Sequence, residues 1–381
     1  MSTAERLRSF GVTIFTEMSD LAREHQAINL GQGFPNWDGA DFVKQAAIGA
    51  IERGGEDQYP PSSGIPELRA ALADHYGPLF GRRLDPDINI TVTSGCTEAL
   101  ASASLGLVNP GDEVVLIEPY YDAYPADVAL AGGVARYVTL RPPDFEIDLD
   151  ELARVVSPAT KAIIVNNPHN PTGRVFSDQE LRGIAELCVE HDVIAISDEV
   201  YEEMVYEGSE HRRLATYDGM WERTLTLSSL GKTFSLTGWK VGWAIGPPDL
   251  TNGLRSAHQF LTFTTPTPVQ HGAAAALQAP GTFYDAMRDG YQSKRDLLSN
   301  GLEAAGFDVF LPAGTYFLMA RHTGDGDDRQ FCLDLIESAG VVAIPPSVFY
   351  SDPTRGAALV RFAFCKDEDT LREALDRISA S

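Results

Sequence analysis

The residue with the clearest chemical potential in this sequence is Lys232, within SSLGKTFSLTGWKVGWAIG at residues 228–246. The chain has six lysines against twenty-four arginines, so a retained lysine points to a need for a primary amine with a removable proton, which arginine cannot offer. Burial or a neighbouring cation lowers the pKa of an ammonium, and the free amine attacks aldehydes and ketones. Lys240 is such a neighbour, or else a phosphate ligand. The small and aromatic residues around both lysines favour a binding loop over a pair of surface lysines.

Two further charges stand in apolar surroundings. Asp198 lies near the end of the predicted strand VIAISDE at residues 193–199, where an unpaired carboxylate costs several kcal/mol in desolvation. One possible partner is a basic side chain of the protein, which would form a salt bridge with Asp198. The other is a protonated ring nitrogen of a ligand. Arg361 lies in the apolar stretch LVRFAF, where an unpaired cation is equally unfavourable, and a guanidinium binds a carboxylate in bidentate fashion.

An alternation of strands and helices must position these residues. Apolar stretches predict strands at residues 88–94, 113–118, 135–140, 161–167, 193–199 and 224–229. Helical patterns lie between them, and one begins with a capping box formed by Ser177 and Glu180. This order predicts βαβ units, hence a mostly parallel sheet with helices on both faces. Ligands bind such sheets beyond the carboxyl ends of the strands.

The predicted strand ends do carry polar or aromatic residues. Residues 94–97, Ser-Gly-Cys-Thr, turn directly into a helix, whose free N–H groups suit a phosphate, although such a turn is often only a helix cap. Tyr121, in EPYYDAY, offers a flat face. Asn170, in NNPHNPTG, belongs to a polar cluster stiffened by two prolines.

Composition excludes several classes of protein. The net charge of -24 and the pI near 4.6 oppose binding to nucleic acid or to an anionic membrane. No apolar run is long enough to span a bilayer and the first residues lack a signal core, so we expect a cytoplasmic protein. The four cysteines form no CxxC pair and the eight histidines show no zinc spacing, which predicts reduced thiols and no metal site.

The lysine stretch, written SxxGKTFSxTGWKxGWxxGP, resembles that of the fold-type I, pyridoxal-phosphate-dependent aminotransferases of class I/II. The resemblance extends from LGQGFP at residues 30–35 to VRFAFCKDEDTL at residues 360–371. It is strongest to the kynurenine and glutamine aminotransferase branch, with methionine and N-succinyl-diaminopimelate aminotransferases nearby. It implies an α/β fold, with a mostly parallel seven-stranded sheet between helices in a large domain and a smaller α+β domain.

We expect three parts. Residues 1–40 form an N-terminal arm and part of the small domain, residues 41–290 a large domain that binds pyridoxal phosphate, and residues 291–381 a C-terminal small domain. Apolar residues from Leu7 to Leu21 recur at helical spacing and predict a helix early in the arm. A long helix is predicted at residues 284–305.

The resemblance also implies roles for residues. Lys232 is the Schiff-base lysine and general base, and Asp198 keeps the pyridinium nitrogen of the cofactor protonated. Tyr201 and Asn170 contact its phenolic oxygen, and Tyr121 stacks on its ring. The implied phosphate cup consists of Gly95, Cys96, Thr97, Ser229 and Lys240.

The implied substrate site uses Arg361 for the α-carboxylate, helped by the backbone of Gly33. Phe15 lines the pocket, and the neighbouring subunit donates Phe263. Tyr59 reaches the phosphate of the neighbouring subunit, which implies a homodimer with shared active sites.

The implied reaction moves the amino group of an L-amino acid to a 2-oxo acid. The aromatic pocket and the lack of a second motif arginine predict large uncharged substrates: aromatic amino acids, methionine, glutamine or kynurenine. Thr97 and Thr264 replace a tyrosine and a histidine of the kynurenine branch, which weakens any specific claim to kynurenine or glutamine. The alternatives are a carbon–sulfur β-lyase acting on cysteine conjugates and an N-succinyl-diaminopimelate aminotransferase. A non-enzymatic cofactor sensor is disfavoured, because the N-terminal segment is too short for a fused DNA-binding domain and the charge is too negative.

Overall fold

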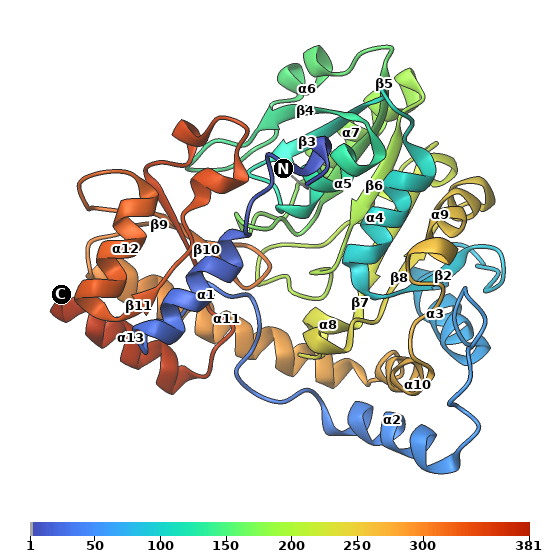
Figure 1. Cartoon of the computed structure of the whole chain (residues 1–381), viewed down its shortest axis with the longest axis horizontal. Coiled ribbons are helices and arrows are strands. Elements are labelled where there is room, and N and C mark those ends of the chain that lie inside the picture. Colours follow the sequence, from blue (N-terminus) through green and yellow to red (C-terminus); the bar gives the residue numbers. More distant parts are fainter. Residues whose placement is uncertain (1–2) are drawn as a thin grey trace.

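The computed structural model describes residues 3–381 and is built around a seven-stranded sheet (Figure 1). The strand order is β2-β8-β7-β6-β5-β3-β4, and β8 alone runs antiparallel to its neighbours. The strands are β2 (Ile90–Thr93), β3 (Glu113–Glu118), β4 (Val134–Thr139), β5 (Thr160–Asn166), β6 (Ile194–Asp198), β7 (Thr224–Ser229) and β8 (Gly242–Ile245). The predicted mostly parallel sheet is therefore confirmed, although β8 was missing from the predicted strands.

Both faces of this sheet are covered, which explains why its central strands are apolar throughout. In β5, Ala162 and Ile164 face one core, whereas Ile163 and Val165 face the other. The first core is closed by α4 (Gly95–Leu107), α5 (Ala123–Ala131) and α9 (Pro248–Leu261), and the second by α6 (Leu149–Val155) and α7 (Asp178–His191). Beside β2 and β8, a third core is closed by α2 (Asp41–Arg53), α3 (Pro66–Leu79) and α10 (Thr267–Ala276).

A smaller α+β part stands beside the large sheet, as predicted. Its antiparallel sheet has the order β12-β10-β9, and a two-stranded pair joins β1 to β11 in parallel. Its elements are β1 (Ile28–Asn29), β9 (Asp308–Phe310), β10 (Phe317–Arg321), α12 (Asp328–Ala339), β11 (Val341–Val342), β12 (Leu359–Ala363) and α13 (Glu368–Ala380). Strand β1, which lies within residues 1–40, thus pairs with the C-terminal part of the chain.

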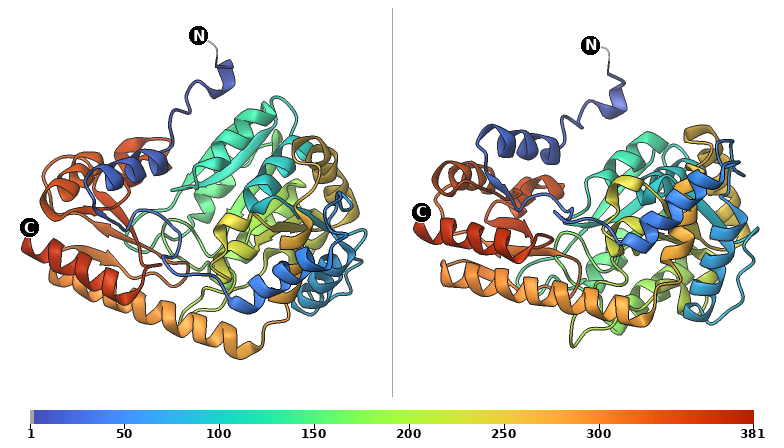
Figure 2. Two further views of the ribbon diagram at one scale, coloured as in Figure 1. Left: turned by 60° about the horizontal axis from the view of Figure 1, so that its bottom comes forward. Right: turned by 90° about the horizontal axis from the view of Figure 1, so that it is seen from below.

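The long helix α11 (Gly281–Ala304) runs beneath both parts of the molecule (Figure 2). The predicted boundary at residue 290 falls inside this continuous helix, and the three-part division of the chain stays a prediction. The remaining short elements are η1 (Glu5–Leu7), η2 (Leu214–Thr216), η3 (Trp221–Arg223), α8 (Leu230–Thr233), η4 (Thr237–Trp239), η5 (Pro346–Phe349) and η6 (Pro353–Arg355).

The N-terminal helix is shorter than its apolar spacing predicted. Helix α1 (Ile14–Glu24) begins after Thr13, whose hydroxyl accepts a hydrogen bond from the backbone N–H of Thr16. Leu7 and Phe10 lie outside α1, so the periodic pattern was read too far toward the amino end. Within residues 3–381, no helix has both the length and the apolar character needed to cross a membrane.

Gln270 ties together two loops at the edge of the large sheet. Its Nε2 donates to the carbonyl of Thr265 at 2.6 Å, and its Oε1 accepts from the N–H of Ile65 at 2.8 Å. The side chain is fully buried, so both backbone groups depend on it.

We therefore expect Gln270→Ala to lower the free energy of unfolding by about 1–3 kcal/mol for each backbone group left unsatisfied. Thermal denaturation of the two proteins measures this. Gln278→Ala, an exposed glutamine just after the same helix, is the matched control and should change stability by less than about 0.5 kcal/mol. Equal melting temperatures for all three proteins would contradict the bridging role.

Candidate functional site

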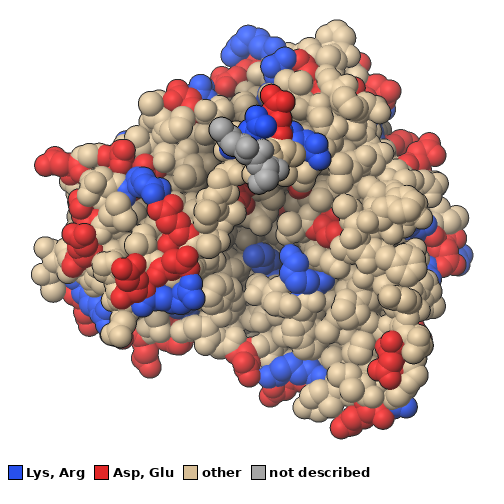
Figure 3. All heavy atoms as spheres, viewed as in Figure 1, with Lys and Arg blue, Asp and Glu red and all other residues tan. Residues whose placement is uncertain are grey.

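A cavity of about 300 Å³ lies between the large sheet and the smaller antiparallel sheet. The face shown in Figure 3 is hollowed near its centre, and basic side chains lie at that hollow, whereas acidic side chains gather over the left side of the molecule. This position follows from topology, because β5, β6 and β7 all end at this edge of the sheet. Most of the predicted site residues line the cavity: Phe15, Gly33, Gly95, Cys96, Thr97, Tyr121, Asn170, Asp198, Tyr201, Ser229, Lys232, Lys240 and Arg361.

Lys232 lies one turn after the end of β7. The sequence predicted a loop here, but the residue is part of the one-turn helix α8, which the hydrogen bond from Phe234 N to Leu230 O closes. Its Nζ donates to the hydroxyl of Tyr316 at 3.0 Å. Burial lowers the pKa of the Lys232 ammonium, and the positive charge of Lys240 acts in the same direction. A lysine in this setting gives up its proton more readily than one on the surface.

Asp198 ends β6 and is 4% exposed. The hydroxyl of Tyr124 donates to Oδ2 at 2.8 Å, and the thiol of Cys96 lies 3.6 Å from Oδ1. Among residues 3–381, no lysine or arginine forms a salt bridge with Asp198, so its contacts do not match the intramolecular ion pair considered above. Burial raises the pKa of Asp198, although the Tyr124 and Cys96 hydrogen bonds oppose that rise. A cationic ligand would favour the ionised carboxylate.

The amino end of α4 forms an anion cradle with Lys240. Gly95 has a φ of +76°, and Lys240 Nζ lies 3.4 Å from the hydroxyl of Thr97. The start of β8 touches this turn so closely that a Cβ on Gly242 would lie 2.5 Å from the carbonyl carbon of Gly95. Free helix N–H groups beside an ammonium are suited to a phosphate.

Arg361 reaches the cavity from β12 and is 1% exposed. One terminal nitrogen donates to the carbonyl of Gly31 at 2.8 Å, and the other donates to Asn170 Oδ1 at 3.2 Å. Its Nε has no partner within the described part of the chain, and no carboxylate there forms a salt bridge with it. A buried guanidinium with no counter-ion is unfavourable unless an anionic ligand completes the site.

Two residues that line the cavity or contact its lining were not predicted from the sequence, namely Asn166 and Tyr316. Tyr316 accepts a hydrogen bond from Lys232 and donates one to the carbonyl of Gly33 at 2.5 Å. Asn166 donates to the carbonyl of Asp198 at 2.9 Å and accepts from the N–H of Asn170 at 2.7 Å. Asn166 stands in the stretch NNPHNPTG noted above, but only contacts across the fold reveal what Asn166 and Tyr316 hold.

Tyr59 and Phe263 lie outside the cavity of their own chain. The Tyr59 side chain is 83% exposed and that of Phe263 is 46% exposed. Their rings meet edge to face at a centroid distance of 5.4 Å. The structure therefore brings these two residues together as an exposed aromatic pair, apart from the other predicted site residues.

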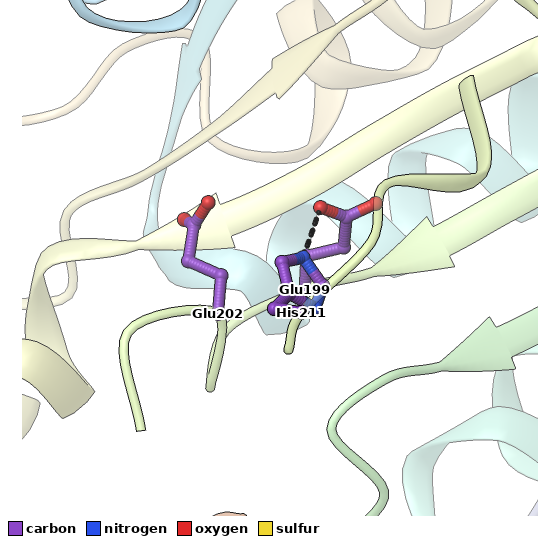
Figure 4. Close-up of side chains that lie close together, drawn as sticks. All are labelled: Glu199, Glu202 and His211. Atoms are coloured by element: carbon purple, nitrogen blue, oxygen red, sulfur yellow. Dashed lines mark hydrogen bonds and ion pairs between the residues drawn. The ribbon is translucent and has the colours of Figure 1, made fainter. Parts of the chain in front are cut away.

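A second polar cluster lies behind Asp198. Glu199 accepts a hydrogen bond from His211 Nε2 at 2.9 Å, with Glu202 beside them (Figure 4). One atom from each of the three lies within 4.8 Å of the others, so these groups could in principle ligate a metal. However, the guanidinium of Arg213 pairs with Glu202 and lies 3.6 Å from Glu199, and it supplies the positive charge itself. We interpret this cluster as an internal ion-pair network.

Comparisons with known proteins agree with this chemistry. Residues 25–378 match the family described as aminotransferase class I and II. The chain is 47% identical to a probable N-succinyldiaminopimelate aminotransferase of Mycobacterium tuberculosis, over 99% of this chain and 98% of the relative. It is 42% identical to a kynurenine–oxoglutarate transaminase of Dictyostelium discoideum, over 98% and 95%.

Among solved structures, a methionine aminotransferase of Escherichia coli superposes with a TM-score of 0.95 at 39% identity, covering all of both chains. This likeness extends to the whole fold, including the smaller sheet that carries Arg361. The matched length, the identity and the fold together make this chain a member of the class I and II aminotransferase family and a fold-type I transferase.

Proposed function

We propose that the cavity binds pyridoxal phosphate and transfers amino groups between L-amino acids and 2-oxo acids. The observation that supports this best is the presence of two basic side chains in one cavity: a half-buried lysine with a lowered pKa, and a buried arginine without a counter-ion. The described residues fit the cofactor. Lys232 offers the amine for its aldehyde, Asp198 the carboxylate for its ring nitrogen, and the amino end of α4 with Lys240 the cradle for its phosphate.

Pyridoxal phosphate, when bound, supplies an electron sink for negative charge that develops at the substrate α-carbon. The protein has to hold the substrate and move one proton. Arg361 binds the α-carboxylate, and Asn170 and the Gly31 carbonyl fix the plane of its guanidinium. Lys232 Nζ takes the proton from the α-carbon of the amino donor. In the second half of the transfer, it delivers a proton to the α-carbon that comes from the 2-oxo acid. Tyr316 restrains that amine by accepting its hydrogen bond.

The charges of the cavity favour uncharged substrate side chains. Its cations are Lys232, Lys240 and Arg361, and each already has a role. Arg255 bonds instead to the carbonyl of Ile90 and to Thr91. A second substrate carboxylate would thus lack a cation, whereas Phe15, Tyr121 and Phe317 offer aromatic walls. Aromatic amino acids, methionine, glutamine and kynurenine fit these walls.

Two alternatives use the same groups. N-succinyldiaminopimelate aminotransferase activity is favoured by the 47% identity to the Mycobacterium tuberculosis relative. Carbon–sulfur β-elimination from cysteine conjugates requires the same lysine, and formation of pyruvate without a 2-oxo acid acceptor would distinguish it. We also propose a cytoplasmic location, which the four buried free cysteines support.

Lys232→Ala should abolish amino transfer while the fold survives, because the other amine that lines the cavity, Lys240, lies at the anion cradle beside Thr97. Borohydride reduction links the cofactor stably to the amine that it has reacted with. Peptide mapping of the reduced enzyme should locate this modification on Lys232. Lys161→Ala, at the opposite end of β5, is the matched control and should keep full activity. Full activity of Lys232→Ala would contradict the assignment.

The charge argument predicts that kcat/KM for phenylalanine and methionine exceeds that for aspartate by about tenfold or more. A tenfold difference corresponds to about 1.4 kcal/mol, and a second carboxylate without a cation costs more than this. Steady-state kinetics with one 2-oxo acid acceptor compares the three donors. N-succinyldiaminopimelate belongs in the same series. If it or aspartate is preferred tenfold, the cavity neutralises a second carboxylate and the aromatic interpretation is wrong.

We propose further that the enzyme is a homodimer with shared active sites. The exposed pair Tyr59–Phe263 supports this, since large aromatic side chains in solvent are typical of interfaces. In such a dimer, each pair would complete the cavity of the partner subunit.

Tyr59→Phe should weaken cofactor affinity, because the hydroxyl that meets the phosphate is lost. Mixing Tyr59→Phe with Lys232→Ala protein then tests whether sites are shared. Random pairing of equal amounts gives half heterodimers with one native site each, so about a quarter of wild-type activity should return at limiting cofactor. Unshared sites would give no activity above the sum of the two separate variants.

A further inference from the structure

The proposed phosphate site shares its helix end with a negative charge. Glu98, in the first turns of α4, accepts a hydrogen bond at Oε2 from the backbone N–H of Ser94, the N-cap residue, at 3.0 Å. Its Oε1 accepts from the hydroxyl of Ser102 at 2.5 Å. The carboxylate therefore lies at the amino end of the helix, whose first residues line the cavity. Coulomb repulsion from this carboxylate opposes the binding of a second anion there.

A histidine on the adjacent helix faces this carboxylate. Helices α4 and α9 pack side by side (Figure 1). His258 of α9 places Nδ1 at 3.0 and 3.1 Å from the two carboxylate oxygens of Glu98, and Nε2 at 2.8 Å from the carbonyl oxygen of Ser62. Because a carboxylate and a carbonyl can only accept, both ring nitrogens carry protons, and the side chain is an imidazolium. It is 1% exposed, so water screens this charge little.

The surroundings of His258 support the charged form. Burial lowers the pKa of His258, but the hydrogen bond to Glu98 and its negative charge outweigh burial, and the pKa lies above its usual range. Arg255, one turn earlier on α9, is the cation that opposes this shift. The loop at Ser62 contributes a carbonyl and no charge. Glu98 and Arg255 are thus the charged groups that act on His258.

We propose that His258 is a positioning residue whose positive charge neutralises the negative charge of Glu98 and so keeps the amino end of α4 able to bind a phosphate. This inference rests on the proposed function, because it takes the cofactor phosphate as the anion. The same imidazolium holds Ser62, and the loop at residues 59–65 also bears Tyr59. One proton therefore fixes both the charge of the helix end and the position of the loop.

The pH dependence follows from the sign of the shift. His258, whose pKa is raised in the folded protein, carries its full positive charge at low pH and loses this charge as the pH rises through that pKa. Above that pKa, the charge of Glu98 is no longer neutralised. Affinity for pyridoxal phosphate should therefore fall on the alkaline side more steeply in the wild-type protein than in a variant without His258.

The test measures equilibrium affinity of the full-length protein for pyridoxal phosphate and for pyridoxal, which has the same ring and aldehyde but no phosphate. His258→Gln keeps a hydrogen-bond donor and removes the charge, so it should weaken pyridoxal phosphate binding about fivefold or more while pyridoxal binding changes by less than about twofold. Adding Glu98→Gln to His258→Gln removes the unmatched carboxylate, and the double variant should return to within about threefold of wild type.

Each outcome decides a different point. If the wild-type protein does not bind pyridoxal phosphate, the proposed function itself fails. If the wild type binds and His258→Gln binds equally well, only the inference about His258 fails. Equal losses for both ligands, without recovery in the double variant, would also overturn it, since they indicate a purely structural role. Should His258→Gln not fold, Glu98→Gln alone decides: its alkaline loss of affinity should move to lower pH, and an unmoved profile would overturn the proposal.

Discussion

The structure depends on keeping three charged side chains, two of them buried and one half-buried, at one cavity without an ion-pair partner from the described part of the chain. Asp198 ends β6, Lys232 lies one turn after the adjacent parallel strand β7, and Arg361 comes from the other sheet. Each is held by neutral partners: a tyrosine hydroxyl, a thiol, an amide or a carbonyl. Such partners orient a charge without neutralising it, so the cavity remains unfavourable until a ligand supplies the missing charges. The rest of the fold holds these unpaired charges in place.

The strands and helices around these charged side chains are tightly packed. The core strands are sealed between helices on both faces, and small residues allow the close contact between β8 and the start of α4. Behind Asp198, the pairs formed by Glu199, Glu202, His211 and Arg213 fix the segment that follows β6. Buried side chains that form ion pairs thus lie next to Asp198, which forms none with the described residues. This separation allows the cavity to be reactive while the rest of the sheet edge remains stable.

Much of this arrangement was predictable from sequence, because strand ends in parallel sheets meet at one edge. That rule predicts that Gly95, Tyr121, Asn170 and Asp198 lie close together, and all four line the cavity. The strand β8 was missed because it has only four residues and stands in a glycine-rich stretch that reads as loop. The role of Tyr316 was missed because it depends on contacts with Gly33 and Lys232, both far away in the chain. Likewise, spacing alone extended α1 too far, since it gave no weight to the cap at Thr13.

The pairing of β1 with β11 has a consequence for how the chain acquires its function during synthesis. The large sheet uses residues 90–245, and these leave the ribosome well before the C-terminal part of the chain. The part of the cavity at Arg361 is different, because the Arg361 guanidinium bonds to the carbonyl of Gly31, 330 positions earlier. The N-terminal segment must therefore wait, without its strand partner, until almost the whole chain has emerged. The Arg361 side of the cavity can thus be completed only after nearly the whole chain has been synthesised.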